Sequence, residues 1–435
     1  VELDMGVEEL MTLVSDEFPS PLERHVICTN GTAAEIDIEV SPSGPFLAQV
    51  FRSVVDPFVG HLTLFRVFSG TLNTDDEFMN VTSNSKERAG KLFLLQGKEQ
   101  TAVSQVVPGD IAAMTKLKNT HFGDTITAVG AELSLPKIHL PQPMMKLAIE
   151  AKSRGDEDKI GEALHHIAEE DPTFLHYRDT DTNEHVIRGM GDLQLEILLA
   201  RLKTKYHVEA ETKLPKVAYR EAIKGTAEAQ GKHKKQSGGH GQYGDVKIKF
   251  SPNARGEGYL FVDSVVGGVV PRQYIPHVDK GIQEALEKGV IAGYPVVDVV
   301  AELNFGSYHD VDSSEMAFKV AAAHAVHEGI KEATPCLLEP ILEIEVTVPI
   351  SSMGDVNGDL SGRRGRILGM DVAPGGKEVI RAAVPESEML RYTTELRSLS
   401  GGRGTYTAKF SHYEEVPETV FKEITAEYER ARSHK

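Results

Sequence analysis

The sequence predicts a multidomain α+β protein that combines a β-barrel, two ferredoxin-like βαββαβ sandwiches and one further α/β domain. Three observations lead to this fold class. At 435 residues the chain exceeds one ordinary core, which indicates about three or four domains. Short β-rich runs without helical stretches fill its first third, and the same alternation of strands and helices occurs twice further along. The composition, 40% hydrophobic and 26% charged, is that of globular proteins.

The N-terminal part predicts one helix and then a barrel. Residues 7 to 18 place Val7, Leu10, Met11 and Val14 on one helical face, and Phe18–Pro21 ends that pattern. An amphipathic helix of this kind packs on a neighbouring core, so we interpret residues 1–25 as the last helix of a preceding domain. Many short strands between 36 and 126 then indicate a closed barrel. Its clearest strands are Phe46–Val50, Leu62–Phe68 and Ile111–Met114.

Two segments repeat the βαββαβ order that is typical of a ferredoxin-like sandwich. In the first, we expect a strand at 144–150, a helix marked by Ile160, Leu164 and Ile167 that ends before Asp171, two strands around 174–188, a helix at 191–203 and a strand at 206–211. In the second, we expect strands at 342–348, 366–371, 377–384 and 405–412, with helices at 353–360 and 386–398. The predicted domains are 1–25, 26–140, 141–214, 215–335 and 336–435.

The segment between the sandwiches carries two Gly-rich loops and two long helices. Val278, Ile282 and Leu286 mark one face of the first helix. The second helix begins with Asp312 as N-cap and Glu315 three residues later, the spacing of a capping box.

The net charge of −18 argues against a nucleic-acid partner, but its distribution does not. Residues 231–249 contain five lysines and one acid, and residues 361–367 contain three arginines and no acid. An acidic body with two basic projections is typical of a protein that contacts RNA at chosen points.

The first loop combines lysines, glycines and rings. Lysines neutralise phosphate, glycines permit close backbone approach, and Tyr243 and His240 can stack on bases. The alternative is a mobile surface loop. The candidate RNA-binding residues here are Lys234, Lys235, Gly238, Gly239, His240, Gly241, Gln242 and Tyr243.

The second loop leads into the capped helix, where exposed N–H groups favour phosphate oxygens. Its candidates are Gly306, Ser307, Tyr308, His309 and Asp310, and the alternative is a simple helix start. In a third cluster, Arg363, Arg364 and Arg366 either bind phosphates or coat a solvated edge.

The sequence lacks the motifs of several common functional sites. No GxxxxGK[ST] loop occurs, so we expect no nucleotide cofactor in this chain, and no nucleophile is placed for a catalytic triad. His165 and His166, like His324 and His327, lack a surrounding ligand set, so we expect no metal site. Cys28 and Cys336 match no metal or redox spacing, and no secretory signal or membrane-length apolar run occurs. These features predict a cytoplasmic protein without a membrane partner.

The motifs, taken together along essentially the whole chain, resemble bacterial elongation factor G. They occur in the family's order at 56–60, 65–70, 108–113, 168–174, 189–197, 236–244, 307–318, 353–356, 402–404 and 412–417. The resemblance implies domains II to V of that factor, with a barrel of the translation-factor domain II type and a domain IV whose tip, Gly238–Tyr243 with Gly306–Asp310, contacts RNA.

The resemblance also implies a role in protein biosynthesis. The partners would be the ribosome, with its RNA and proteins, tRNA and mRNA, and the factor would be a monomer that promotes translocation. The chain itself would not be an enzyme, since the GTPase domain, with GTP and Mg²⁺, belongs to the full-length protein.

This sequence departs from the family pattern at several positions. His240 replaces an arginine, Asn304 and Phe305 replace an acidic context, and Asp192–Gln194 replaces Glu-Leu-His. Loss of arginine weakens a phosphate contact because histidine offers no bidentate fork. Two alternatives therefore stay open: a divergent paralogue acting in ribosome recycling, rescue or protection, and a stand-alone RNA-binding protein.

Overall fold

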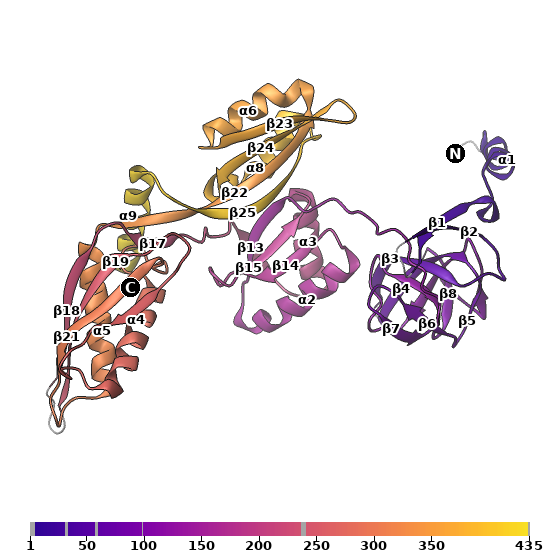
Figure 1. The fold of residues 1–435 in the computed structure, drawn as a ribbon. Coiled ribbons are helices and arrows are strands. Elements are labelled where there is room, and N and C mark those ends of the chain that lie inside the picture. Colours follow the sequence, from indigo (N-terminus) through magenta and orange to yellow (C-terminus); the bar gives the residue numbers. More distant parts are fainter. Residues whose placement is uncertain (1–4, 31–33, 57–59, 98, 236–240, 434–435) are drawn as a thin grey trace. The chain divides into compact units, whose positions relative to one another are not determined.

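The structure is a computed structural model that describes residues 5–30, 34–56, 60–97, 99–235 and 241–433 (Figure 1). It divides into two compact units. The first unit is Val1–Arg178 with His185–Lys213, and the second unit is Asp179–Glu184 with Leu214–Lys435. Within the described part, no helix has the length and apolar character needed to cross a membrane.

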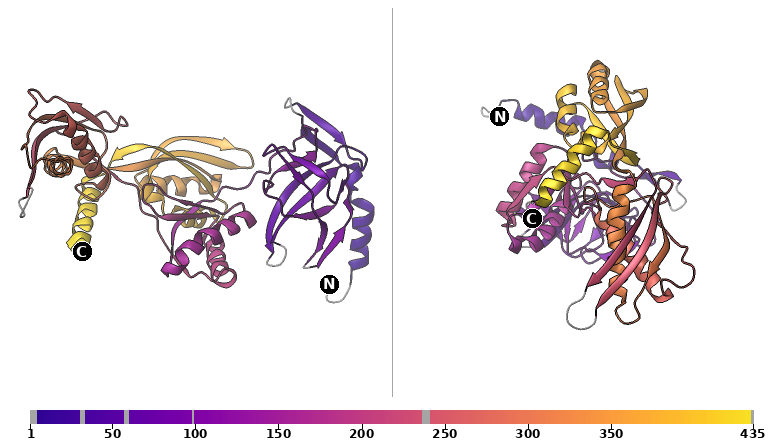
Figure 2. Two further views of the ribbon diagram at one scale, coloured as in Figure 1. Left: turned by 90° about the horizontal axis from the view of Figure 1, so that it is seen from below. Right: turned by 90° about the vertical axis from the view of Figure 1, so that its left-hand side faces the viewer.

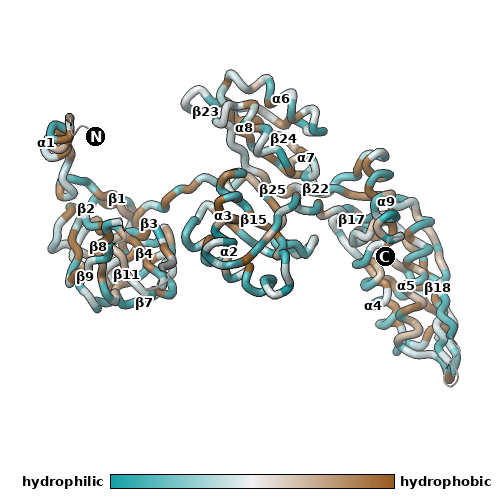
Figure 3. Tube along the Cα trace, turned by 180° about the vertical axis from the view of Figure 1, so that it is seen from behind, coloured by the Kyte–Doolittle hydropathy of each residue, from teal (hydrophilic) through white to brown (hydrophobic). Residues whose placement is uncertain are grey.

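The predicted N-terminal helix is present as α1 (Val7–Glu17). None of its residues is buried, although Leu10, Met11 and Val14 are apolar (Figure 3). The chain then passes through the 3₁₀ turn η1 (Pro21–Glu23), which Ser20 caps by accepting a hydrogen bond from the Leu22 N–H.

The predicted barrel is an eight-stranded antiparallel sheet around one core. Its order is β7-β6-β12-β3-β4-β11-β8-β9. Phe65, Phe78, Met114 and Ile126 are fully buried inside it. Register shifts between β3 and β4 bend these two long strands, which helps the sheet to curl. Among the described residues no ladder joins the end strands β7 and β9.

The strands of this domain are β1 (His25–Thr29), β2 (Glu35–Glu39), β3 (Leu47–Asp56), β4 (Gly60–Ser69), β5 (Leu72–Asn73), β6 (Glu77–Asn80), β7 (Ser85–Arg88), β8 (Leu92–Gln96), β9 (Glu99–Val103), β10 (Gln105–Val106), β11 (Ile111–Thr115) and β12 (Thr125–Ala128). β1 pairs with β2, and β5 with β10, in two small separate sheets.

The first ferredoxin-like sandwich has the predicted βαββαβ order and the sheet order β14-β15-β13-β16. The predicted last strand at 206–211 is too early. His207 adopts a positive φ of 55° and Val208 N donates to Leu202 O, so the chain turns before it can pair. The elements are β13 (Met145–Ala151), α2 (Glu157–Glu170), β14 (Leu175–Arg178), β15 (His185–Gly189), α3 (Asp192–Lys205) and β16 (Ala210–Lys213).

The α/β domain of the second unit is a four-stranded sheet with helices α4 (Ile275–Lys288) and α5 (Glu315–Glu332) packed on it (Figure 2). The order is β18-β19-β21-β20, from β18 (Ala227–Lys235), β19 (Gln242–Pro252), β20 (Leu260–Asp263) and β21 (Val299–Ser307). Helix α5 contributes small residues to the core, including Ala321, Ala322 and Ala325. Because they are small, the helix backbone approaches β18 closely: a Cβ at Gly231 would clash with Ala321 O.

The second sandwich is built on one long strand, β22 (Pro335–Pro349). Its first residues pair with β17 (Arg220–Ile223), and the rest pairs with β24 and β25. The segment 215–335 is therefore joined to the last domain by a shared sheet. The other elements are α6 (Met353–Gly362), β23 (Arg366–Ala373), β24 (Lys377–Pro385), α7 (Glu386–Met389), α8 (Tyr392–Ser400), β25 (Thr405–Glu415) and α9 (Glu418–Ser433).

Two features of this domain differ from or extend the sequence prediction. The helix expected at 386–398 is split into α7 and α8, because the chain bends at Arg391 (φ −113°, ψ 5°) and brings Tyr392 into the core. Helix α9 was not predicted; its Phe421, Ile424 and Tyr428 pack in a cluster around buried Leu337.

Candidate nucleic-acid interface

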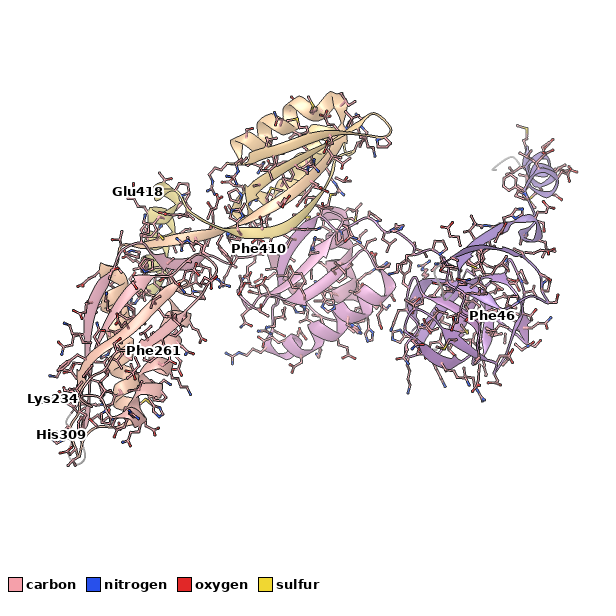
Figure 4. All side chains as sticks on the ribbon, in the orientation of Figure 1. Phe46, Lys234, Phe261, His309, Phe410 and Glu418 are labelled. Atoms are coloured by element: carbon pink, nitrogen blue, oxygen red, sulfur yellow. The ribbon has the colours of Figure 1, made fainter. Side chains whose placement is uncertain are left out.

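The two candidate loops lie at the same end of the α/β domain. β18 and β19 pair antiparallel as far as Lys235 and Gln242, and β21 ends beside β19 at the pair Asp245 and Ser307. Figure 4 shows the labelled Lys234 and His309 together at this end. We call the described residues Lys234, Lys235, 241–245 and 306–313 the tip. The predicted Gly238, Gly239 and His240 lie outside the described residues.

A network of hydrogen bonds between polar side chains joins the two loops. Ser307 Oγ donates to Asp245 Oδ2 at 3.0 Å, so the Tyr243 hydroxyl, 2.7 Å from Ser307 Oγ, is placed to donate to it. Gln230 Nε2 donates to the other oxygen, Asp245 Oδ1, at 2.8 Å. Asp245 is 7% exposed, so this carboxylate is compensated inside the domain. Tyr243 and Ser307 therefore hold the loops together, and their polar groups are used internally.

Asp312 is a second link between the loops. Its carboxylate Oδ1 accepts from Gly241 N at 3.0 Å, and its carbonyl accepts from Tyr243 N at 2.8 Å. The predicted N-cap role of Asp312 is wrong. Ser314 caps α5 instead: it is extended, and its Oγ accepts from Ala317 N at 3.2 Å.

His309 is oriented by the backbone of its own loop. Its Nδ1 accepts from Asp312 N at 3.3 Å and from Val311 N at 3.4 Å. The same Nδ1 lies 3.5 Å from Asp312 Oδ2. In the tautomer that accepts from the two amides, the ring proton is on Nε2. The side chain is 57% exposed, and neighbouring Tyr308 is 47% exposed. The loop therefore presents a donor, Nε2–H, and an aromatic ring to solvent.

Three of the five lysines in residues 231–249 interact with other side chains of the domain. Lys247 pairs with Glu228 at 2.7 Å, and Lys249 lies 4.0 Å from Glu302. Lys232 lies over the Tyr243 ring, with Nζ 5.5 Å from its centroid. The remaining lysines of the stretch, 234 and 235, are exposed and have no acidic partner in the described part of the chain. Of the five lysines, these two are the ones whose charge no acidic side chain within the described residues offsets.

The described glycines of the tip serve packing. A Cβ at Gly306 would lie 2.5 Å from Asp245 O, and one at Gly244 would lie 2.6 Å from Ala317 O. The sequence interpretation, in which glycines permit approach to RNA, misses this function. Glycine is needed at both positions because β19 lies directly against β21 and the start of α5.

The arginine cluster is largely internal. Arg363 bonds Asp359 at 2.8 Å and the Glu388 carbonyl at 2.8 Å, and it also pairs with Glu395. The geometry does not favour the predicted phosphate contact for a side chain that is only 14% exposed.

Arg364 is engaged in the same way. It forks onto the Glu339 carboxylate and lies 3.0 Å from Glu388, with φ 58°. Of the three arginines, Arg366 has the exposure a phosphate ligand needs: its side chain is 66% exposed, and it lies 3.6 Å from the Glu414 carboxylate.

Comparison with known proteins matches each of these domains to one family. Residues 45–129 match elongation factor G domain 2, residues 140–214 match domain III, residues 215–334 match domain IV and residues 336–424 match the elongation factor G C-terminus.

The chain is also similar to a protein from Thermus thermophilus whose crystal structure is known. The two are 39% identical with a TM-score of 0.76, over 99% of this chain and 62% of that one. This chain therefore spans less than two thirds of that relative. Four matches in consecutive order, on domains with the expected folds, show that the chain belongs to the elongation factor G family.

Proposed function

We propose that this chain is the ribosome-binding portion of an elongation-factor-G-type translational GTPase, and that its tip contacts RNA during GTP-dependent movement of tRNA and mRNA. The observation that carries the proposal is the convergence of two separate loops at one end of the domain. The Asp245 and Asp312 contacts hold them together.

The exposed chemistry of the tip suits RNA. Lys234 and Lys235 can neutralise phosphates, the Nε2–H of His309 can donate to a phosphate or base acceptor, and Tyr308 offers a face for stacking. The chain as a whole carries −18, so RNA is attracted at the tip and repelled elsewhere.

The remaining parts of the proposal concern the longer protein. This chain spans 62% of the similar Thermus protein, and we assign GTP hydrolysis, with GTP and Mg²⁺, to a domain outside this sequence. The chain itself then acts as a binding and conformational module without a catalytic site. We propose that it works as a monomer in the cytoplasm, with ribosomal RNA and proteins, tRNA and mRNA as partners.

Co-sedimentation with 70S ribosomes across a salt series tests the tip. The variant Lys234→Gln with Lys235→Gln removes the two uncompensated charges. The matched control, Lys280→Gln with Lys288→Gln, makes the same charge change on exposed positions of α4 in the same domain. Each lost phosphate contact should flatten the log–log salt dependence of binding by roughly 0.7 to 0.9, and the control should keep the slope of the unaltered chain.

The outcomes separate the proposal from its alternatives. Equal slopes for the tip variant and the control would remove Lys234 and Lys235 from the RNA contact. Binding to free RNA without preference for ribosomes would indicate a stand-alone RNA-binding protein. In poly-phenylalanine synthesis with the full-length protein, ribosome-stimulated GTP hydrolysis without elongation would indicate a paralogue acting in recycling, rescue or protection.

A further inference from the structure

A group of histidines in the first unit is brought together by the fold alone. His165 and His166 are adjacent on α2, and Glu169 on the same helix is the further ligand group that the local sequence offers them within one turn. The structure places His61, at the start of strand β4 in the barrel domain, beside them: the His61 and His166 ring centroids are 5.6 Å apart. Three imidazoles then surround one carboxylate, that of Glu169.

The polar atoms of this group face a common point. Glu169 Oε2 lies 3.6 Å from His61 Nε2 and 3.3 Å from His166 Nδ1. One ligand atom from each of these three residues lies within 4.8 Å of the other two. The side chains are 39%, 27% and 23% exposed for His61, His166 and Glu169, so they are half-buried yet reachable from solvent.

These separations suit a tetrahedral divalent ion. Zinc binds imidazole nitrogen and carboxylate oxygen at about 2.0 to 2.2 Å, and two ligands of a tetrahedron with such bonds are roughly 3.4 Å apart. The two measured separations from Glu169, 3.3 and 3.6 Å, lie on either side of that value. Two imidazoles and one carboxylate form a known ligand set for zinc, with water as the fourth ligand.

Glu162 and His165 are placed to form hydrogen bonds with the proposed metal ligands, as outer groups of a metal site do. If His166 binds through Nδ1, its Nε2–H faces Glu162 Oε1 at 3.8 Å, the arrangement in which a carboxylate orients a ligating histidine. His165 Nε2 lies 3.7 Å from Glu169 Oε1 and can orient the ligating carboxylate.

An ion can reach this group. A cleft of about 530 Å³ is lined by His61, His165 and Glu169 together with Thr63, Thr120 and His121. His61 and Glu169 face this cleft directly, whereas His166 is not part of its lining. The hydroxyl groups of Thr63 and Thr120 in the lining can hydrogen-bond a water that serves as the fourth ligand.

We propose that His61, His166 and Glu169 form a binding site for Zn²⁺ or a similar borderline transition-metal ion. Imidazole and carboxylate together favour zinc, copper or nickel over Mg²⁺ and Ca²⁺, which prefer oxygen ligands. Because His61 is on β4 and the other two ligands are on α2, the ion ties the barrel to the sandwich that follows it. The site is separate from the tip, and the proposal does not depend on the proposed function.

Isothermal titration of the EDTA-treated, tag-free 435-residue chain with ZnCl₂ tests this directly. We expect one saturable site, and binding of Co²⁺ with the visible absorption of a tetrahedral complex. His61→Gln and His166→Gln should each weaken zinc binding at least about tenfold. His25→Gln is the control, since His25 also faces a carboxylate, Asp37 at 2.8 Å, in the same unit but without other ligands among the described residues; it should leave the affinity unchanged.

Circular dichroism of each variant shows that a loss of binding is not a loss of fold, because both ligands are partly exposed and glutamine is similar in size. Absence of zinc binding by the unaltered, folded chain would overturn the proposal. So would zinc affinity that is the same in His61→Gln, His166→Gln and the control. Loss in His166→Gln alone would also overturn it, because a site confined to α2 does not tie the two domains together.

Discussion

Replacing Ser314 with alanine tests which residue begins helix α5. Ser314 Oγ accepts from Ala317 N at 3.2 Å, and the helix buries Phe318 and Val326 in the core of its domain. Removing an N-cap hydroxyl costs about 1 kcal/mol, within a range of roughly 0.5 to 2. The cost falls on folding of this domain because α5 is central to its core. For a unit of this size, about 1 kcal/mol lowers Tm by roughly 2 to 4 °C.

The matched comparison is Asp312→Ala. Asp312 accepts from Gly241 N, not from the first turn of α5, so its loss should free the Gly241 amide and leave α5 intact. Hydrogen exchange distinguishes the two variants. About 1 kcal/mol corresponds to roughly fivefold faster exchange through opening, expected at Ala317 in Ser314→Ala and not in Asp312→Ala.

The overall unfolding is best followed by calorimetry or circular dichroism, since the chain contains no tryptophan. The reasoning is refuted if Asp312→Ala lowers Tm and exposes the Ala317 amide while Ser314→Ala does neither. That result would show that Asp312, as the sequence spacing predicted, is the N-cap of α5.

Three further perturbations follow from the same contacts. Arg364→Ala leaves Glu339, only 2% exposed, without its fork, so we expect a loss of roughly 2 to 4 kcal/mol in urea unfolding; recovery in Arg364→Lys to full stability would contradict the bidentate role. His309→Ala should weaken ribosome binding at unchanged Tm, because the ring is exposed and packs little, and a large fall in Tm would show a structural role instead. Burial, and then the neighbouring His185 and His165, lower the pKa of His176 below its ordinary value of 6.5, and burial likewise lowers the pKa of His185. Because the unfolded state then takes up protons first, stability that is complete above about pH 6.5 should fall as the pH drops below it. His176→Gln with His185→Gln, compared in EDTA, should flatten that dependence, and an unchanged profile would exclude these two histidines as its cause.

The periodicity of the sequence by itself determined the fold class and most of the elements. Helices such as α1 and α2, and strands such as β4 and β11, follow from patterns within a few residues, because helix and strand burial repeat locally. The elongation factor G resemblance was confirmed by the family matches. That the two Gly-rich loops contact RNA stays a prediction.

The tertiary structure decided which partner each polar side chain has. Asp312 and Ser314 are both good N-caps, and only the path of β19 shows that Asp312 is taken by Gly241. Arg363 and Arg364 look like free cations until Glu339 and Glu395 come into contact with them from other elements.

The tertiary structure also decided which residues far apart in the sequence come into contact. The ion pair of Lys247 with Glu228 depends on residues far apart in the sequence, as does the pairing of β17 with β22. The His61 and His166 group shows this most plainly: neither residue has a ligand set in its own segment, and both gain one when β4 meets α2. Charge compensation and ligand geometry depend on distances in space, which the local pattern of residues does not contain.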